Sequence, residues 1–142
     1  MPSQYDPVKK CRVGTMDEGQ FYAECDKSNG AYFRRLLGAW TQAGGALKWG
    51  TGGVGLRAKI GGKEAGVCFL APAFGGKKDR IELACTMLAK QIGDARCEKL
   101  KTALHGVADD SVAGTTMLSI IQPGLLSTKG QDTLTEVFTG LL

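Results

Sequence analysis

Residues 46–71, ALKWGTGGVGLRAKIGGKEAGVCFLA, decide the fold, because short apolar segments alternate there with glycine-rich turns. Three strands are expected, at 46–49, 55–60 and 63–71. Gly61 and Gly62 form a two-residue link between the second and third, which suits the positive φ angles of a type I′ hairpin turn. The third segment is apolar on both faces in its second half, as in a strand near a sheet centre. The stretch therefore predicts an antiparallel β-meander.

An amphipathic helix is expected directly before the meander. From residue 32 to residue 43, aromatic and aliphatic side chains recur at i, i+1, i+4, i+5, i+8 and i+11, which places them on one helical face. Ser28 or Asn29 supplies an N-cap, and Gly44 supplies the C-terminal stop. We expect this helix to anchor the core through its aromatic residues and leucines.

Residues 79–92 fit two secondary structures equally well. Asp79 and Glu82 have the spacing of a capping pair, and the apolar residues at 81, 85, 88 and 92 share one helical face. The residues at 81, 83, 85 and 87 also alternate with period two, as in a half-buried strand. The sequence leaves both alternatives open.

Three further elements complete one α+β domain over residues 1–142. Asp94 is expected to cap a helix that ends near Gly106, a strand covers 115–121, and a capping-box spacing at 128–131 opens an amphipathic terminal helix. Residues 1–20 are polar and aperiodic, so we expect a mobile arm with a short edge strand near residues 10–13. The predicted architecture has two layers, with a helix, the meander, a helix, a strand and a C-terminal helix.

Composition indicates a soluble cytoplasmic protein of bacterial type. The chain has 142 residues, 43% of them hydrophobic, and its longest uncharged apolar stretches fall far short of a bilayer span. We therefore expect no membrane partner. The five cysteines include no C-x-x-C pair and are expected to pack as small, reduced, buried side chains. We expect no metal site and no cofactor.

Positive charge is concentrated in a glycine-rich middle segment. Residues 44–76 contain 11 of the 21 glycines, and residues 48–80 carry a net charge of +5. On strands, Arg57 and Lys59 point to the same face, with Lys48 and Lys63 on neighbouring strands. These four residues form a predicted anion-binding face for a weakly bound polyanion or nucleic acid, and Trp49 could add base stacking. A solvated face that blocks edge pairing is the simpler interpretation of the same charges.

Residues that resemble known phosphate-binding and catalytic motifs lack the surrounding elements or partner residues that those functions need. Residues 50–55 satisfy G-x-G-x-x-G literally, but a predicted strand follows them where a dinucleotide site needs a helix. A nuclease would need converging carboxylates and a lysine; Asp79 and Glu82 come closest, and Ala84 stands at the lysine position. His105, the only histidine, could form a catalytic pair with a cysteine only if the fold brings the two residues together, because no cysteine is close to it in the sequence.

The order of motifs resembles a loose group of small uncharacterised bacterial α+β domains. The resemblance is carried by a Tyr/Phe-Leu-Leu-x-x-Trp helix, the Trp-Gly-x-Gly-Gly turn at 49–53 and a hairpin ending in Phe-Leu-Ala-Pro at 69–72. It covers residues 28 to about 105 and implies a fold, with no activity or site residues to transfer.

The sequence favours a non-enzymatic binding or interaction module with a weakly basic, glycine-rich sheet face. The partner is then a polyanion such as nucleic acid, or another protein. The alternative is a hydrolytic or nuclease-like enzyme that acts on an anionic substrate.

Overall fold

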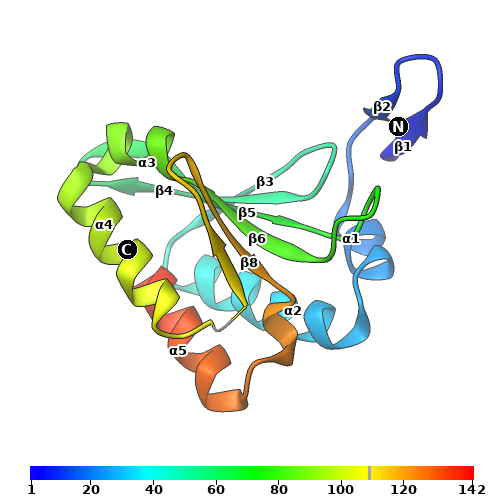
Figure 1. Ribbon diagram of the computed structural model, residues 1–142. Helices are drawn as coiled ribbons and strands as arrows, with labels where there is room; N and C mark the ends of the chain where they lie inside the picture. Colours follow the sequence, from blue (N-terminus) through cyan, green and yellow to red (C-terminus); the bar gives the residue numbers. More distant parts are fainter. Residues whose placement is uncertain (109) are drawn as a thin grey trace.

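An antiparallel sheet forms the centre of the fold. The computed structural model describes residues 1–108 and 110–142, and in this part of the chain six strands pair in the order β3-β4-β5-β6-β8-β7 (Figure 1). The strands are β3 (Ala46–Trp49), β4 (Val54–Ile60), β5 (Lys63–Ala71), β6 (Arg80–Ala84), β7 (Ser111–Ala113) and β8 (Met117–Ile121). β3, β4 and β5 confirm the predicted meander, and the fold is of the α+β class.

Helices cover one face of this sheet. They are α2 (Lys27–Gln42), α3 (Cys85–Ile92), α4 (Asp94–His105) and α5 (Thr128–Thr139), with a 3-10 turn η1 (Pro123–Leu125) before α5. In Figure 1, α2, α4 and α5 lie below the sheet, and α3 lies at its left-hand end. Along β4, every second residue is buried towards the helices, and the residues between them face the opposite side of the sheet and are more exposed.

The helix ends differ from those expected. Asp26 caps α2, accepting the N–H of Ser28 at 3.0 Å, so Ser28 and Asn29 lie inside the first turn. Ser127 caps α5 in the same way through the N–H of Gly130. Asp26 stands two or three residues before the predicted cap of α2, and Ser127 stands one residue before that of α5. A carboxylate or hydroxyl in extended conformation is the physical requirement, and both residues meet it.

Residues 79–92 contain both of the alternatives that the sequence left open. Arg80–Ala84 is strand β6, in which Ile81 and Leu83 are fully buried, and Cys85–Ile92 is helix α3. The spacing of the apolar residues changes from the strand period to the helix period after Ala84. The strand pattern therefore describes the first part of the segment, and the helix pattern describes the second. β5 continues past the end of β6, and Gln91 of α3 accepts the N–H of Gly66 at 3.1 Å. α3 thereby covers a strand edge that would otherwise be unpaired.

The first 20 residues, expected as a mobile arm, have a defined structure. β1 (Gln4–Asp6) and β2 (Cys11–Val13) pair in a small antiparallel sheet, and α1 (Glu18–Glu24) follows. Met16 is completely buried, and its N–H donates to the carbonyl of Gly50 at 2.9 Å. Figure 1 shows the hairpin at the right-hand end of the sheet, beyond the β5–β6 loop.

The core lies between the sheet and α2. Phe33, Leu36 and Trp40 are completely buried there, as the helical pattern predicted. The indole N–H of Trp40 donates to the carbonyls of Ala46 and Arg57, which joins the helix to strands β3 and β4. The first helix therefore both fills the core and fixes the near edge of the sheet.

A buried polar group connects three distant segments. The carboxylate of Asp79, 2% exposed, accepts the N–H groups of Asp26 and Ala73, both at 2.6 Å, and the amide of Asn29 at 3.0 Å. Asn29 in turn accepts the N–H of Gly124 at 2.9 Å. A side chain at Gly124 would strike the backbone of residue 28. The start of α2 is thus fastened to the β5–β6 loop and to η1.

In the described part of the chain, no helix has the length and apolar character needed to cross a bilayer.

Candidate functional site

The sheet face away from the helices carries the predicted cations. In β4, Val54, Leu56, Ala58 and Ile60 face the helices and are buried, so Gly55, Arg57 and Lys59 face the opposite way. Lys48 of β3 lies directly opposite Gly55 in the register and therefore shares this face. We call this surface the open face.

A hollow of about 270 Å³ lies on the open face. Its floor contains Gly55 and Gly66, at which the sheet presents backbone instead of side chains. Lys48, Arg57 and Phe69 stand around it, each on a different strand. The hollow therefore exists because two strands carry glycine where their neighbours carry large side chains.

Phe69 provides the flat apolar wall of this hollow. Gly55 lies opposite Phe69 in the β4–β5 register, and a methyl group added at Gly55 would lie 3.9 Å from the ring. Methyl groups at Gly50 and Gly52 would lie 3.9 and 4.0 Å from it. The ring thus has glycines as its neighbours on the β4 side and is only partly buried.

Three of the four predicted anion-binding residues lie on the open face. Lys48 and Arg57 line the hollow, and Lys59 continues the same row of β4. Lys63 pairs with Ile60, which is buried on the helix-covered side, so the register places Lys63 on that side at the end of the hairpin. The structure brings the first three together and leaves Lys63 apart.

Acidic residues partly balance the cations of the open face. Arg57 Nε lies 3.4 Å from Glu64 Oε1, with both side chains substantially exposed, so water weakens this ion pair. Arg80 donates to Glu82, which lies directly opposite Phe69 on β6. Arg57 is therefore not fixed to its partner and is able to exchange Glu64 for another anion.

The structure places Trp49 differently from the sequence-based expectation. Trp49 lies opposite Val54 on the helix-covered side and packs edge-on against Phe21, with ring centroids 5.6 Å apart. It cannot stack a ligand on the open face. Phe69 is the aromatic residue that lines the hollow on the open face, and the sequence pattern hid it because the second half of β5 is apolar on both faces. Gly55 on β4 and Gly66 on β5 were the available signal.

The carboxylates considered for nuclease chemistry lie in different environments. Asp79 is buried and already accepts three N–H groups, whereas Glu82 lies on the open face beside Arg80. Asp79 therefore has a structural role at the start of α2. Among residues 1–108 and 110–142, no three His, Cys, Asp or Glu side chains gather as metal ligands would.

A second hollow, of about 520 Å³, lies between α3 and α4. Cys85 and Cys97 line it, and the Cys97 thiol donates to the carbonyl of Cys85 at 3.5 Å. Burial, followed by the charge of a Cys85 thiolate, raises the pKa of Cys97. Two lysines and two acids line the same space, so their charges cancel. The raised pKa keeps the Cys97 thiol in its less reactive, protonated form.

His105 lies away from these features, at the end of α4. Its Nδ1 is 2.9 Å from the hydroxyl of Ser111, and the histidine is exposed. Burial raises the pKa of Cys68 far above its ordinary value. The structure therefore does not bring the histidine and the buried thiols together as a nucleophile and its base.

The chain matches no protein-family model, no curated protein and no solved structure. These comparisons do not bear on the resemblance to small bacterial α+β domains. The geometry of the open face is thus the basis for a functional proposal.

Proposed function

We propose that the protein is a non-enzymatic binding module that holds a single-stranded nucleic acid on the open face of its sheet. The observation that carries this proposal is the hollow in which Phe69 stands beside a floor of Gly55 and Gly66, with Lys48 and Arg57 at its rim. A partly exposed aromatic ring and nearby cations are what a base and its phosphates require.

The chemistry of each component fits a nucleotide strand. A base can stack on the Phe69 ring, because stacking on an aromatic side chain depends on the π-face that all bases share. The glycines let the strand approach the backbone closely, since they add no bulk. Lys48, Arg57 and Lys59 supply the positive charge for phosphates, and binding releases counterions.

Shape favours a single strand over a duplex. The major groove admits a helix or a two-stranded ribbon, whereas this open face is the surface of a six-stranded sheet. Bases inside a duplex are stacked on one another and cannot reach Phe69. An unpaired strand has free bases and a flexible backbone, so it can lie across the strands.

The test is fluorescence anisotropy with single-stranded oligothymidine and a duplex of matched length, at several salt concentrations. We expect the single strand to bind more tightly than the duplex. Phe69→Ala should weaken binding roughly 5- to 100-fold, which corresponds to the loss of one stacked base. Lys48→Ala combined with Arg57→Ala should weaken binding and lower the slope of log K against log salt by about 1.4, since each single-strand phosphate contact contributes ~0.7.

Two further variants separate binding from folding. Gly55→Val fills the hollow at a strand position, where replacing glycine leaves stability unchanged or raises it, so binding should be lost without unfolding. Lys27→Ala with Lys129→Ala removes the same charge from exposed helix positions and should leave most of the affinity. If no oligonucleotide binds at low salt, or if Gly55→Val binds as the wild type does, the proposal is wrong.

A further inference from the structure

A second aromatic surface lies at the end of the sheet, where the β5–β6 loop and the N-terminal hairpin are found. Phe74, in the β5–β6 loop, is 42% exposed, and Tyr5 of β1 is 52% exposed. Their ring centroids are 6.2 Å apart at an interplanar angle of 45°. Exposed aromatic rings seldom gather without a reason, because each leaves apolar area in water.

The loop that carries Phe74 also presents cations. Phe74 and Lys77 form an antiparallel bridge, with backbone hydrogen bonds of 3.1 and 3.0 Å around the two glycines between them. Gly75 and Gly76 have φ angles of 58° and 84°, which a side chain would strain. Directly opposite residues project from the same side, so the side chains of Phe74 and Lys77 point the same way from the loop, and exposed Lys78 follows in the chain.

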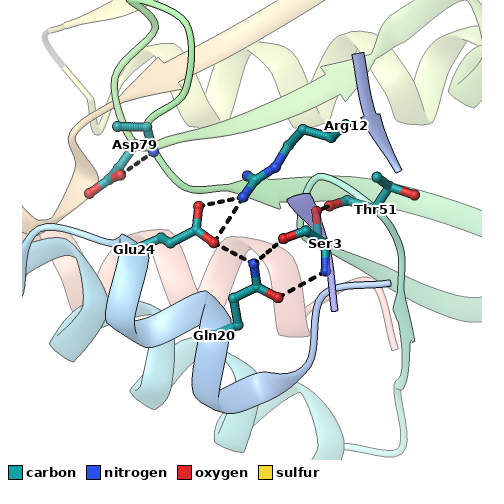
Figure 2. A network of polar contacts seen from close by, with 7 residues as sticks. Ser3, Arg12, Gln20, Glu24, Thr51 and Asp79 are labelled. Atoms are coloured by element: carbon teal, nitrogen blue, oxygen red, sulfur yellow. Dashed lines mark hydrogen bonds and ion pairs between the residues drawn. The ribbon is translucent and has the colours of Figure 1, made fainter. Parts of the chain in front are cut away.

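The N-terminal hairpin is attached in a way that fixes Tyr5 beside this loop. Figure 2 shows the contacts: Gln20 donates to the carbonyl of Ser3 at 2.6 Å and to Glu24 at 2.7 Å, and Arg12 donates to both oxygens of Glu24 at 2.7 and 2.9 Å. The Ser3 hydroxyl donates to the carbonyl of Thr51. These bonds hold β1 and β2 against α1 and the β3–β4 loop.

Arg12 links this network to the aromatic surface. Its guanidinium carbon lies 4.7 Å from the centroid of the Phe74 ring, a cation–π contact, while its Nη2 is bound by Glu24. The ring of Phe74 is thus supported from one side and exposed elsewhere. These contacts of the Phe74 ring exist before any ligand arrives, which lowers the entropy cost of ordering the ring on binding.

Phe74 and Phe69 belong to the same stretch of chain. Phe69 lies in β5, which ends at Ala71, and Phe74 follows five positions after Phe69. Five residues span at most about 18 Å. A strand stacked on Phe69 and continuing along β5 towards the loop therefore reaches Phe74 within a few nucleotides.

We propose that Tyr5, Phe74, Lys77 and Lys78 form a second subsite for the same single-stranded nucleic acid, so that the strand runs from the hollow on the open face to the N-terminal hairpin. This inference rests on the proposed function, and it adds the direction of the strand and the part played by the hairpin. The rings stack bases, and the two lysines contact the phosphates between them.

The test compares oligothymidines of about 3 and about 10 nucleotides, since only the longer one can occupy both subsites. For the wild type, the longer strand should bind at least tenfold more tightly. Tyr5→Ala with Phe74→Ala should remove most of this length advantage, while urea unfolding reports whether the fold is intact. Phe74→Leu keeps apolar packing against Arg12 and Tyr5 but lacks a ring, and it should also lose the advantage.

Phe74→Trp supplies an independent readout. It retains the ring, should keep the length advantage, and its fluorescence should be quenched when the longer oligomer stacks on it. If the longer strand still binds better to Phe74→Leu, or if Phe74→Trp is not quenched, the second subsite is wrong and the hollow remains. If neither oligomer binds to the wild type, the proposed function itself fails.

Discussion

Replacement of Asp79 by alanine tests the buried connection at the start of α2. The substitution leaves three donors without an acceptor: the backbone N–H groups of Asp26 and Ala73, and the side-chain amide of Asn29. Hydrogen bonds to a charged group contribute about 1.5–3 kcal/mol each, and they are not additive because water can enter the vacated space. We expect a loss of about 3–5 kcal/mol in the free energy of unfolding, a large share of the ~5–15 kcal/mol typical of a domain.

The assay is urea denaturation followed by tryptophan fluorescence, with the slope m compared between variants. Asp79→Asn keeps an acceptor oxygen but turns an NH2 group towards the remaining donors, so it should lose less than the alanine variant and still fold. Asp132→Ala, at an exposed helix position, is the matched control and should change stability by less than about 0.5 kcal/mol. A loss below about 1 kcal/mol for Asp79→Ala at unchanged m would refute the structural role assigned to this carboxylate.

Three further predictions concern the core, the helix cap and the thiols. Leu36→Ala, at a completely buried position, should cost about 2–5 kcal/mol in urea denaturation, and a loss under about 0.5 kcal/mol would contradict the assigned core face. Hydrogen bonds from Ser28 lower the pKa of Asp26. The contribution of Asp26 to stability is therefore present above its unfolded pKa, near 4, and is lost as pH falls through the lower folded pKa. Asp26→Asn should flatten the acid limb of a stability–pH profile, and an unchanged limb would count against the cap. With Ellman's reagent at pH 8, exposed Cys11 should react rapidly. Burial, and to a lesser extent the charge of Asp79, raises the pKa of Cys25 to about 12, so Cys25 should react slowly. Five thiols should appear in denaturant, and a second rapid thiol in the native protein would contradict this prediction.

The elements with strong periodicity were predictable from the sequence. The helix over residues 27–42 and the three strands of the meander follow directly from apolar spacing and from the two-glycine turn at Gly61 and Gly62. In each of these elements, apolar residues lie on the buried face and polar residues on the face towards water, so the pattern is visible in the local sequence. The short elements β7 and α1 were missed, because three and seven residues hold too few apolar positions to show a period.

The site was predictable only in part, since it depends on register. Alternation along β4 placed Arg57 and Lys59 on one face. The face on which Lys48 lies is defined only by its pairing with Gly55. Lys63 and Trp49 lie on the other side because of their cross-strand partners, Ile60 and Val54. No local pattern in a single sequence specifies these partners.

The attachment of the N-terminal hairpin was hidden for a similar reason. Ser3, Arg12 and Gln20 form their hydrogen bonds with one another, with Glu24 and with Thr51, across separations of up to 48 positions. Polar side chains carry no periodic signal, so the segment resembled a mobile arm. Buried polar networks of this kind appear only when the fold brings their members together.

Mapping of amide chemical shifts during titration with oligothymidine tests the central claim most directly. The account predicts that the largest changes occur at residues around the hollow, at Lys48, Gly55, Gly66 and Phe69, and that they diminish as salt is raised. Changes confined to the helix-covered side, for example along α5, or no changes at low salt, would contradict binding of a single strand on the open face.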